Sequence, residues 1–187
     1  MQPQSYDTDL KTIITTLSLD ALARIRNPRF YKTERGFQGE FAAVVHQGMN
    51  SQALIGEQFV VEEEYQKRRI HLTRQRPDLI LHLPTEVSGA IPNQNNIAVW
   101  AFKQKAHPGK ARRDFENLDV MFDRLNYPIG VFINISSHLH HLNLYEGPFP
   151  ERMVAFATRL EADAIFVIQA SFIDGNNVEQ QYEFPLA

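Results

Sequence analysis

Three charged residues stand where the surrounding sequence makes a charge costly. Asp78 opens one apolar run, Lys103 closes another, and Glu40 falls among apolar residues repeated at helical spacing. A carboxylate in such a setting is stable when it is paired, hydrogen-bonded or bound to a metal. An ammonium that ends so apolar a strand needs a partner or a chemical role. The three residue types together suggest a site in which carboxylates and a lysine act on one ligand.

Each of these residues also has a purely structural explanation. Aspartate after proline is a common turn or strand-opening residue, and Asp78 follows Pro77. A lysine at the end of a strand is commonly solvated. Glu40 could pair with Arg35 or with an arginine of segment 67–76.

The periodicity of apolar residues predicts the elements that would position these side chains. Helical spacing predicts helices over 1–26, 34–48, 110–126 and about 150–161, and Ser18 could restart a second short helix within the first. Runs rich in β-branched and apolar residues predict strands at 58–65, 77–83, 97–103, 129–135 and 164–172. This order predicts one α/β domain with a mixed central β-sheet flanked by helices. Because strand side chains alternate, we expect Ala101 and Lys103 on one face and Trp100 on the other.

Composition limits the possible classes of protein. The chain has 187 residues and 21.5 kDa, which suits one globular domain. With no cysteine, it has no disulfide framework, thiol nucleophile or cysteine-bound metal. No stretch is typical of a transmembrane helix or a signal peptide, so we expect a cytoplasmic protein.

Basic residues are concentrated in two segments although the net charge is −3. Segments 67–76 and 103–113 hold ten of the nineteen lysines and arginines and no acidic residue. They form a basic patch if the fold brings them together, and two solvated loops if it does not.

A helical glutamate, a strand opening with Pro77-Asp78 and an apolar strand ending in Ala101-Phe102-Lys103 resemble the PD-(D/E)XK nuclease superfamily. The resemblance implies a restriction-endonuclease-like core of helix, three-strand meander, helix and strand over 34–135. Segment 1–33 would then be an N-terminal helical extension. Segment 136–187 would supply a C-terminal helix and strand that complete the sheet.

The resemblance also implies a function, that of a DNA endonuclease dependent on Mg²⁺ or Mn²⁺. Asp78, Glu40 and an acid at position 101 would hold the metal, and Lys103 would orient or deprotonate the attacking water. Basic residues would neutralise backbone phosphates. These are Arg74, Arg76, Lys105, Lys110, Arg112 and Arg113. A homodimer would suit the cutting of two antiparallel strands.

Position 101 departs from the motif, because alanine stands where the superfamily has glutamate or aspartate. The chain could be an inactivated form of an active nuclease, in which Ala101→Glu restores the pattern. It could instead be a catalytically silent fold that binds nucleic acid or a partner protein. In a third interpretation the acid has moved to the following helix, at Glu116 or Asp119. An α/β domain with a purely structural Asp78 and Lys103 is the remaining alternative.

Overall fold

The computed structural model describes residues 6–51, 59–63, 77–84 and 95–186. The helices are α1 (Tyr6–Arg24), α2 (Glu34–Ser51) and α4 (Pro108–Leu125), with 3-10 turns η1 (Phe30–Lys32), η4 (Leu142–Leu144) and η5 (Pro150–Arg152). The strands are β1 (Val60–Glu63), β2 (Leu79–His82), β3 (Asn96–Gln104), β4 (Ile129–Ile135), β5 (Met153–Leu160), β6 (Ala164–Ile173) and β7 (Asn176–Pro185). None of the helices in these ranges is long and apolar enough to cross a membrane.

The described strands form one mixed sheet of seven strands, in the order β1 to β7. Strands β1, β2 and β3 form an antiparallel meander. The connection through α4 makes β4 parallel to β3, and β5 is in turn parallel to β4. Antiparallel β6 and β7 then complete the sheet. The expected α/β class with a mixed sheet flanked by helices is confirmed.

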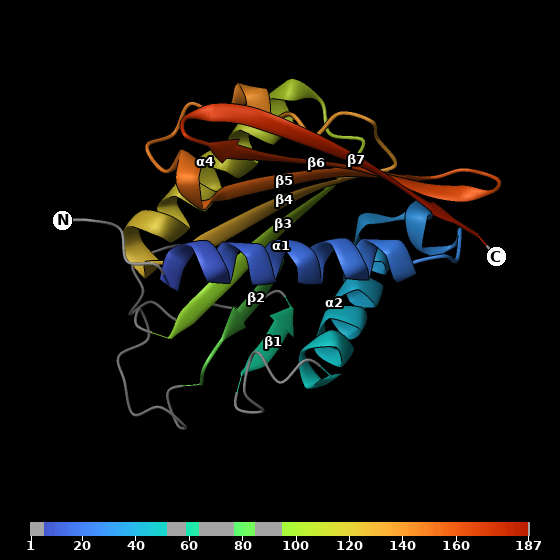
Figure 1. Ribbon diagram of the computed structural model, residues 1–187, viewed down its shortest axis with the longest axis horizontal. Helices are drawn as coiled ribbons and strands as arrows, with labels where there is room; N and C mark the ends of the chain where they lie inside the picture. The colour runs from blue at the N-terminus through green and yellow to red at the C-terminus, as the bar shows by residue number, and fades with distance from the viewer. Residues whose placement is uncertain (1–5, 52–58, 64–76, 85–94, 187) are drawn as a thin grey trace.

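Helices cover the two faces of the sheet (Figure 1). On one face, α1 and α2 pack against the even-numbered side chains of β3, including Trp100. On the other face, α4 packs against Val99 and Phe132. The expected alternation along β3 is therefore correct, and Lys103 lies on the α4 side, where it contacts Asp114 of that helix.

Helix α1 is continuous through Ser18, contrary to the expected restart at that residue. The Ser18 hydroxyl donates to the Ile14 carbonyl at 2.7 Å and accepts the Trp100 indole N–H at 3.0 Å. Because its hydrogen bonds are satisfied within and across the helix, serine does not interrupt α1 here. Helix α1 buries apolar residues against the sheet, so it belongs to the core and is not an appended extension.

The helix expected near 150–161 is wrong, because that segment forms the 3-10 turn η5 and strand β5. Met153, Phe156, Ala157 and Leu160 mimic helical spacing. The segment is apolar on both faces because β5 is an inner strand of the sheet, and from Met153 to Thr158 every residue is buried. Strand β7 was not expected at all; its first six residues are exposed and polar but for Val178, so it carries almost no apolar signal.

Candidate functional site

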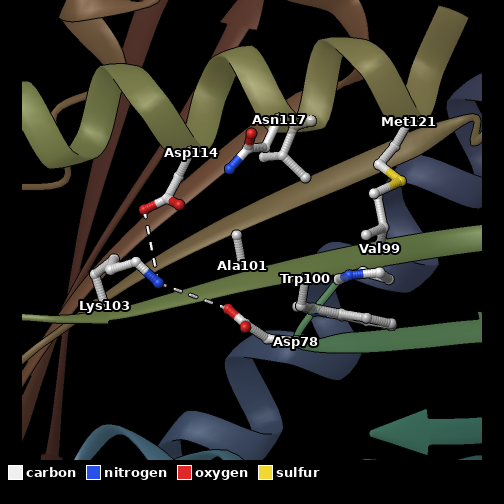
Figure 2. Close-up of a pocket in the computed structure, with 10 residues that line it drawn as sticks. Asp78, Val99, Trp100, Ala101, Lys103, Asp114, Asn117 and Met121 are labelled. Carbon is white, nitrogen blue, oxygen red and sulfur yellow. Dashed lines mark ion pairs between the residues drawn. The ribbon is translucent and has the colours of Figure 1, made fainter. Parts of the chain in front are cut away.

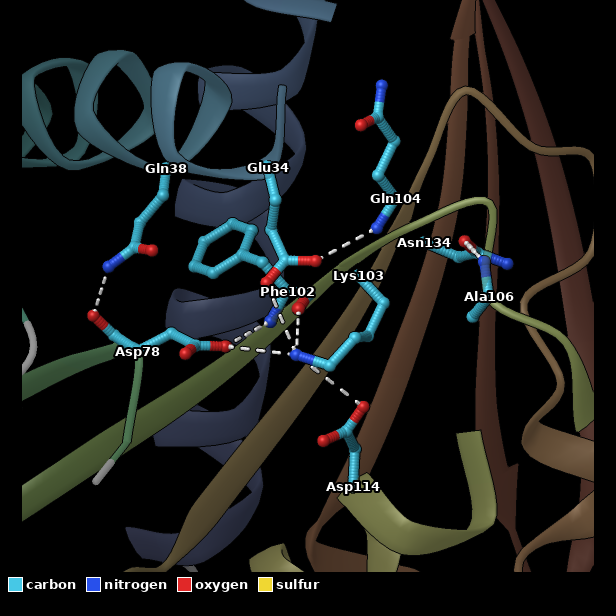
Figure 3. Close-up of polar contacts among 9 residues, drawn as sticks. All are labelled: Glu34, Gln38, Asp78, Phe102, Lys103, Gln104, Ala106, Asp114 and Asn134. Carbon is cyan, nitrogen blue, oxygen red and sulfur yellow. Dashed lines mark hydrogen bonds and ion pairs between the residues drawn. The ribbon is translucent and has the colours of Figure 1, made fainter. Parts of the chain in front are cut away.

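The ammonium of Lys103 is surrounded by carboxylates from three other elements (Figure 3). Lys103 Nζ lies 3.3 Å from Glu34 Oε1, 3.8 Å from Asp114 Oδ2 and 3.9 Å from Asp78 Oδ2. It also donates to the Phe102 carbonyl at 2.7 Å. The first residue of α2, the residue that precedes β2 and the buried side of α4 therefore meet at the end of β3.

Asp78 is fixed through its backbone and its side chain. Its Oδ2 accepts the Phe102 backbone N–H at 2.8 Å, two residues beyond Trp100, which forms the last β2–β3 pair with Leu79. Its backbone carbonyl accepts a hydrogen bond from the amide of Gln38 on α2. The side chain thus continues the hydrogen bonding of β3 where β2 has not yet begun.

Glu34 joins the beginning of α2 to the end of β3. While Oε1 contacts Lys103, Oε2 accepts the Gln104 backbone N–H at 3.2 Å. The Gln104 side chain in turn donates to the Tyr31 carbonyl at 2.9 Å. These contacts hold the Lys103 segment against the α2 side of the cluster.

Asp114 supplies an acid from the buried stripe of α4. It is 7% exposed, and among the described residues its Oδ2 has no hydrogen-bond partner, only the ion pair with Lys103. Burial raises the pKa of Asp114 to about 6; Lys103 and Arg113 oppose this rise, while Asp78 and Glu34 add to it. The Asp114 carboxyl therefore changes its protonation state close to neutral pH.

Lys103 remains an ammonium in this setting. Burial alone would lower the pKa of Lys103, but the carboxylates of Asp78, Asp114 and Glu34 together raise it above the ordinary value. In this arrangement the side chain is a cation that orients and neutralises anions, and it is not a base that removes protons at neutral pH.

A cavity of about 210 Å³ opens beside the cluster, between β3 and α4 (Figure 2). Ala101 faces this cavity, with Asp78 on one side and Asp114 on the other. Asn117, Leu118 and Met121 continue the α4 wall. A longer side chain at position 101 would thus project between the two aspartates.

Buried polar contacts fix the start of α4 relative to β3. The Asn134 amide on β4 accepts the Ala106 N–H at 2.9 Å and donates to the Leu139 carbonyl at 2.7 Å. The His141 imidazole lies 2.9 Å from the Ala106 carbonyl, to which its Nε2 donates. Ala106 immediately precedes His107, the N-cap residue of α4. Both backbone groups of Ala106 are thus held, which fixes where the helix that carries Asp114 begins.

The structure brings together three of the four residues expected at the site, namely Asp78, Ala101 and Lys103. Glu40 lies elsewhere on α2, partly exposed, and no hydrogen bond or ion pair among the described residues involves it. It lies beside the buried stripe of α2 and not within it, whereas Glu34, at the first residue of the helix, faces Lys103.

The acid on α4 is Asp114 and not one of the two residues named from the sequence. Glu116 is exposed, and Asp119 accepts a hydrogen bond of 2.6 Å from the Tyr145 hydroxyl. Asp114 does carry a sequence signal, since it lies three residues after Ala111 and four before Leu118, within the apolar stripe. Glu34 carries no such sequence signal, because its contacts are with the end of β3, which is distant in the chain.

Four of the basic residues expected to contact nucleic acid are exposed around the start of α4. They are Lys105, Lys110, Arg112 and Arg113. Arg74 and Arg76, with the rest of segment 67–76, lie outside the described residues.

The donor types at the cluster suit a hard divalent cation. Mg²⁺ prefers carboxylate oxygens and is commonly held by one or two of them together with water. Asp78 and Asp114 supply such oxygens at the cavity, and Asp114 Oδ2 is buried without a hydrogen bond. Within the described ranges, however, no three His, Asp or Glu side chains converge on one point as metal ligands. The carboxylates of the cluster instead surround the Lys103 ammonium.

The fold and site together define an α/β protein with a lysine-centred carboxylate cluster at a cavity. Comparisons with family models, curated proteins and solved structures return no match.

Proposed function

We propose that the chain is a metal-dependent DNA endonuclease of the PD-(D/E)XK type. The order α2, β1–β3, α4, β4 agrees with the core that the sequence resemblance implies. The observation that carries the proposal is the approach of the Lys103 ammonium to three carboxylates, at 3.3–3.9 Å, beside a cavity that Ala101 faces.

The residues of the cluster have separate roles in this proposal. Asp78 and Asp114 would hold a divalent cation, which supplies Lewis acidity and an activated water when it is bound. Lys103, as an ammonium, would orient the scissile phosphate and offset the negative charge that develops on it. Glu34 would keep Lys103 directed at the cavity, and the basic residues around the start of α4 would bind flanking phosphates.

The alanine at position 101 is compatible with two forms of the proposed nuclease. In the first, Asp114 supplies the acid that the motif lacks, and the chain is active as it stands. In the second, the active parent has an acid at position 101, and alanine has inactivated it. The second version is supported by the cavity, into which a side chain at position 101 would extend.

The test is cleavage of supercoiled plasmid DNA with Mg²⁺ or Mn²⁺. The chain is compared with Ala101→Glu, and Ala101→Glu/Lys103→Ala is the control. Cleavage by the chain itself supports Asp114 as the acid. Cleavage by Ala101→Glu alone supports an inactivated nuclease, provided that the double variant does not cut. If none of the three proteins cuts, the endonuclease proposal is wrong.

A catalytically silent module that binds nucleic acid or a partner protein is the second candidate. It is favoured by the alanine at position 101 and by the carboxylates that already neutralise Lys103. DNA binding without cleavage, unchanged in Ala101→Glu, would support this candidate.

A further inference from the structure

Lys103 is the shared cation of three carboxylates in the cluster. Glu34, Asp78 and Asp114 bring three negative charges when ionised, and Lys103 forms an ion pair with each of them. Arg113, which also opposes the rise in the pKa of Asp114, is exposed, whereas Lys103 is half-buried among the carboxylates.

The contacts of Lys103 are of two kinds. It donates a short hydrogen bond to the Phe102 carbonyl at 2.7 Å and a longer one to Glu34 at 3.3 Å. Its separations from Asp114 and Asp78, 3.8 and 3.9 Å, are beyond hydrogen-bonding distance. Lys103 is thus anchored on the Glu34 side and only electrostatically attracted to the two aspartates.

The two aspartates to which Lys103 makes no hydrogen bond line the cavity, whereas Glu34 does not line it. The ammonium lies between Asp78 and Asp114 (Figure 2). A cation that entered the cavity to bind both aspartates would therefore meet Lys103 there, and two cations sharing those carboxylates would repel each other.

We propose that Lys103 is an internal counter-ion that a divalent cation must displace from Asp78 and Asp114, with Glu34 and the Phe102 carbonyl retaining the lysine. The proposal rests on the proposed function, since the cation is the one that phosphodiester cleavage would require. In the cation-free protein, Lys103 neutralises part of the charge of the carboxylates. It therefore lowers the affinity of Asp78 and Asp114 for the divalent cation.

Cation affinity measured by calorimetry with Mn²⁺ tests this proposal without reference to activity. Lys103→Met keeps the length of the side chain and removes the charge, and should bind Mn²⁺ at least about tenfold more tightly than the unmodified chain. Lys105→Met removes the same charge two residues away, from an exposed side chain, and should change the affinity by less than about twofold. Equal or weaker binding by Lys103→Met would overturn the proposal.

A second measurement uses the unmodified chain, in case Lys103→Met does not fold. Lysines are acetylated with and without Mn²⁺, and the rate at each site is measured by peptide mass spectrometry. Displacement would break the ion pairs of Lys103 with both aspartates, so Mn²⁺ should accelerate its acetylation and leave Lys105 unchanged. An unchanged or slower reaction at Lys103 would contradict displacement.

The two proposals fail in different ways. If the chain or Ala101→Glu cuts plasmid DNA but Lys103→Met binds Mn²⁺ no more tightly, the displacement is wrong and the endonuclease stands. If neither the chain nor Lys103→Met binds Mn²⁺, the displacement and the metal dependence are both wrong.

Discussion

The buried Oδ2 of Asp114 lies 3.8 Å from the ammonium of Lys103, and both residues line the cavity between α4 and β3. This pair joins two consecutive elements of the chain, and both backbone groups of the intervening Ala106 are held by Asn134 and His141. The site therefore depends on the docking of α4 as much as on the sheet.

Asp114→Asn should weaken the binding of divalent cations and reduce cleavage. If Asp114 is a ligand, loss of its negative oxygen should weaken Mn²⁺ binding by about a hundredfold, and cleavage should fall at least as far. Calorimetry and plasmid cleavage measure the two effects. The matched control is Asp119→Asn on the same helix, which removes a carboxylate bound to Tyr145 and should leave Mn²⁺ affinity unchanged. Equal losses in both variants would show a general effect of charge on α4.

The stability of the cation-free protein should depend on pH through Asp114. Burial raises the pKa of Asp114 to about 6 in the folded state, against about 3.9 for an unfolded aspartate. The folded state therefore holds this proton more tightly, and its stabilising contribution is complete below pH 4 and lost as pH rises through 6. Asparagine cannot ionise. The stability of Asp114→Asn relative to the unmodified chain should thus increase by about 2–3 kcal/mol between pH 4 and pH 7.5. Urea unfolding in EDTA measures this difference, and a difference independent of pH would contradict it.

DNA binding should weaken steeply with added salt if the exposed residues at the start of α4 contact phosphates. Each contact contributes close to one unit to the slope of log affinity against log salt concentration. Lys110→Ala and Arg112→Ala should each reduce that slope by about one. Arg24→Ala is the control, because Arg24 ends α1 on the opposite side of the sheet and its guanidinium donates to Gln47. If all variants had the same dependence of affinity on salt concentration, the start of α4 would not be the surface that contacts DNA.

Two glycine substitutions should test the packing of α4 independently of function. A Cβ at Gly130 would lie 2.7 Å from Phe122 Cε1 and would push α4 away from β4. Gly130→Ala should therefore destabilise the fold by about 1–3 kcal/mol. At Gly39 on α2 an added Cβ would meet nothing within 4 Å, so Gly39→Ala should stabilise the fold by about 0.5–1 kcal/mol. Thermal unfolding of the two variants gives the comparison, and a loss at both positions would contradict it.

The sequence predicted the part of the site that belongs to single strands. The strand opened by Asp78, the alternation along β3 and the position of Lys103 follow from local pattern, and they are correct. Glu34, and not Glu40, meets Lys103, because apolar spacing along a helix does not reveal which of its residues lies beside a strand end distant in the chain. Asp114 could have been found, since an acid within an apolar stripe is unusual. The helix wrongly expected at β5 has a different cause. An inner strand that is buried on both faces lacks the alternation that distinguishes strands from helices.

The strand order, in which each described strand lies beside its neighbours in sequence, has a consequence for synthesis of the protein. Contacts between sequence neighbours keep loop-closure entropy small. The sheet can therefore grow one strand at a time as the chain leaves the ribosome. Residues 34–135 include the whole charge cluster, so the site can assemble while the last strands are still being translated.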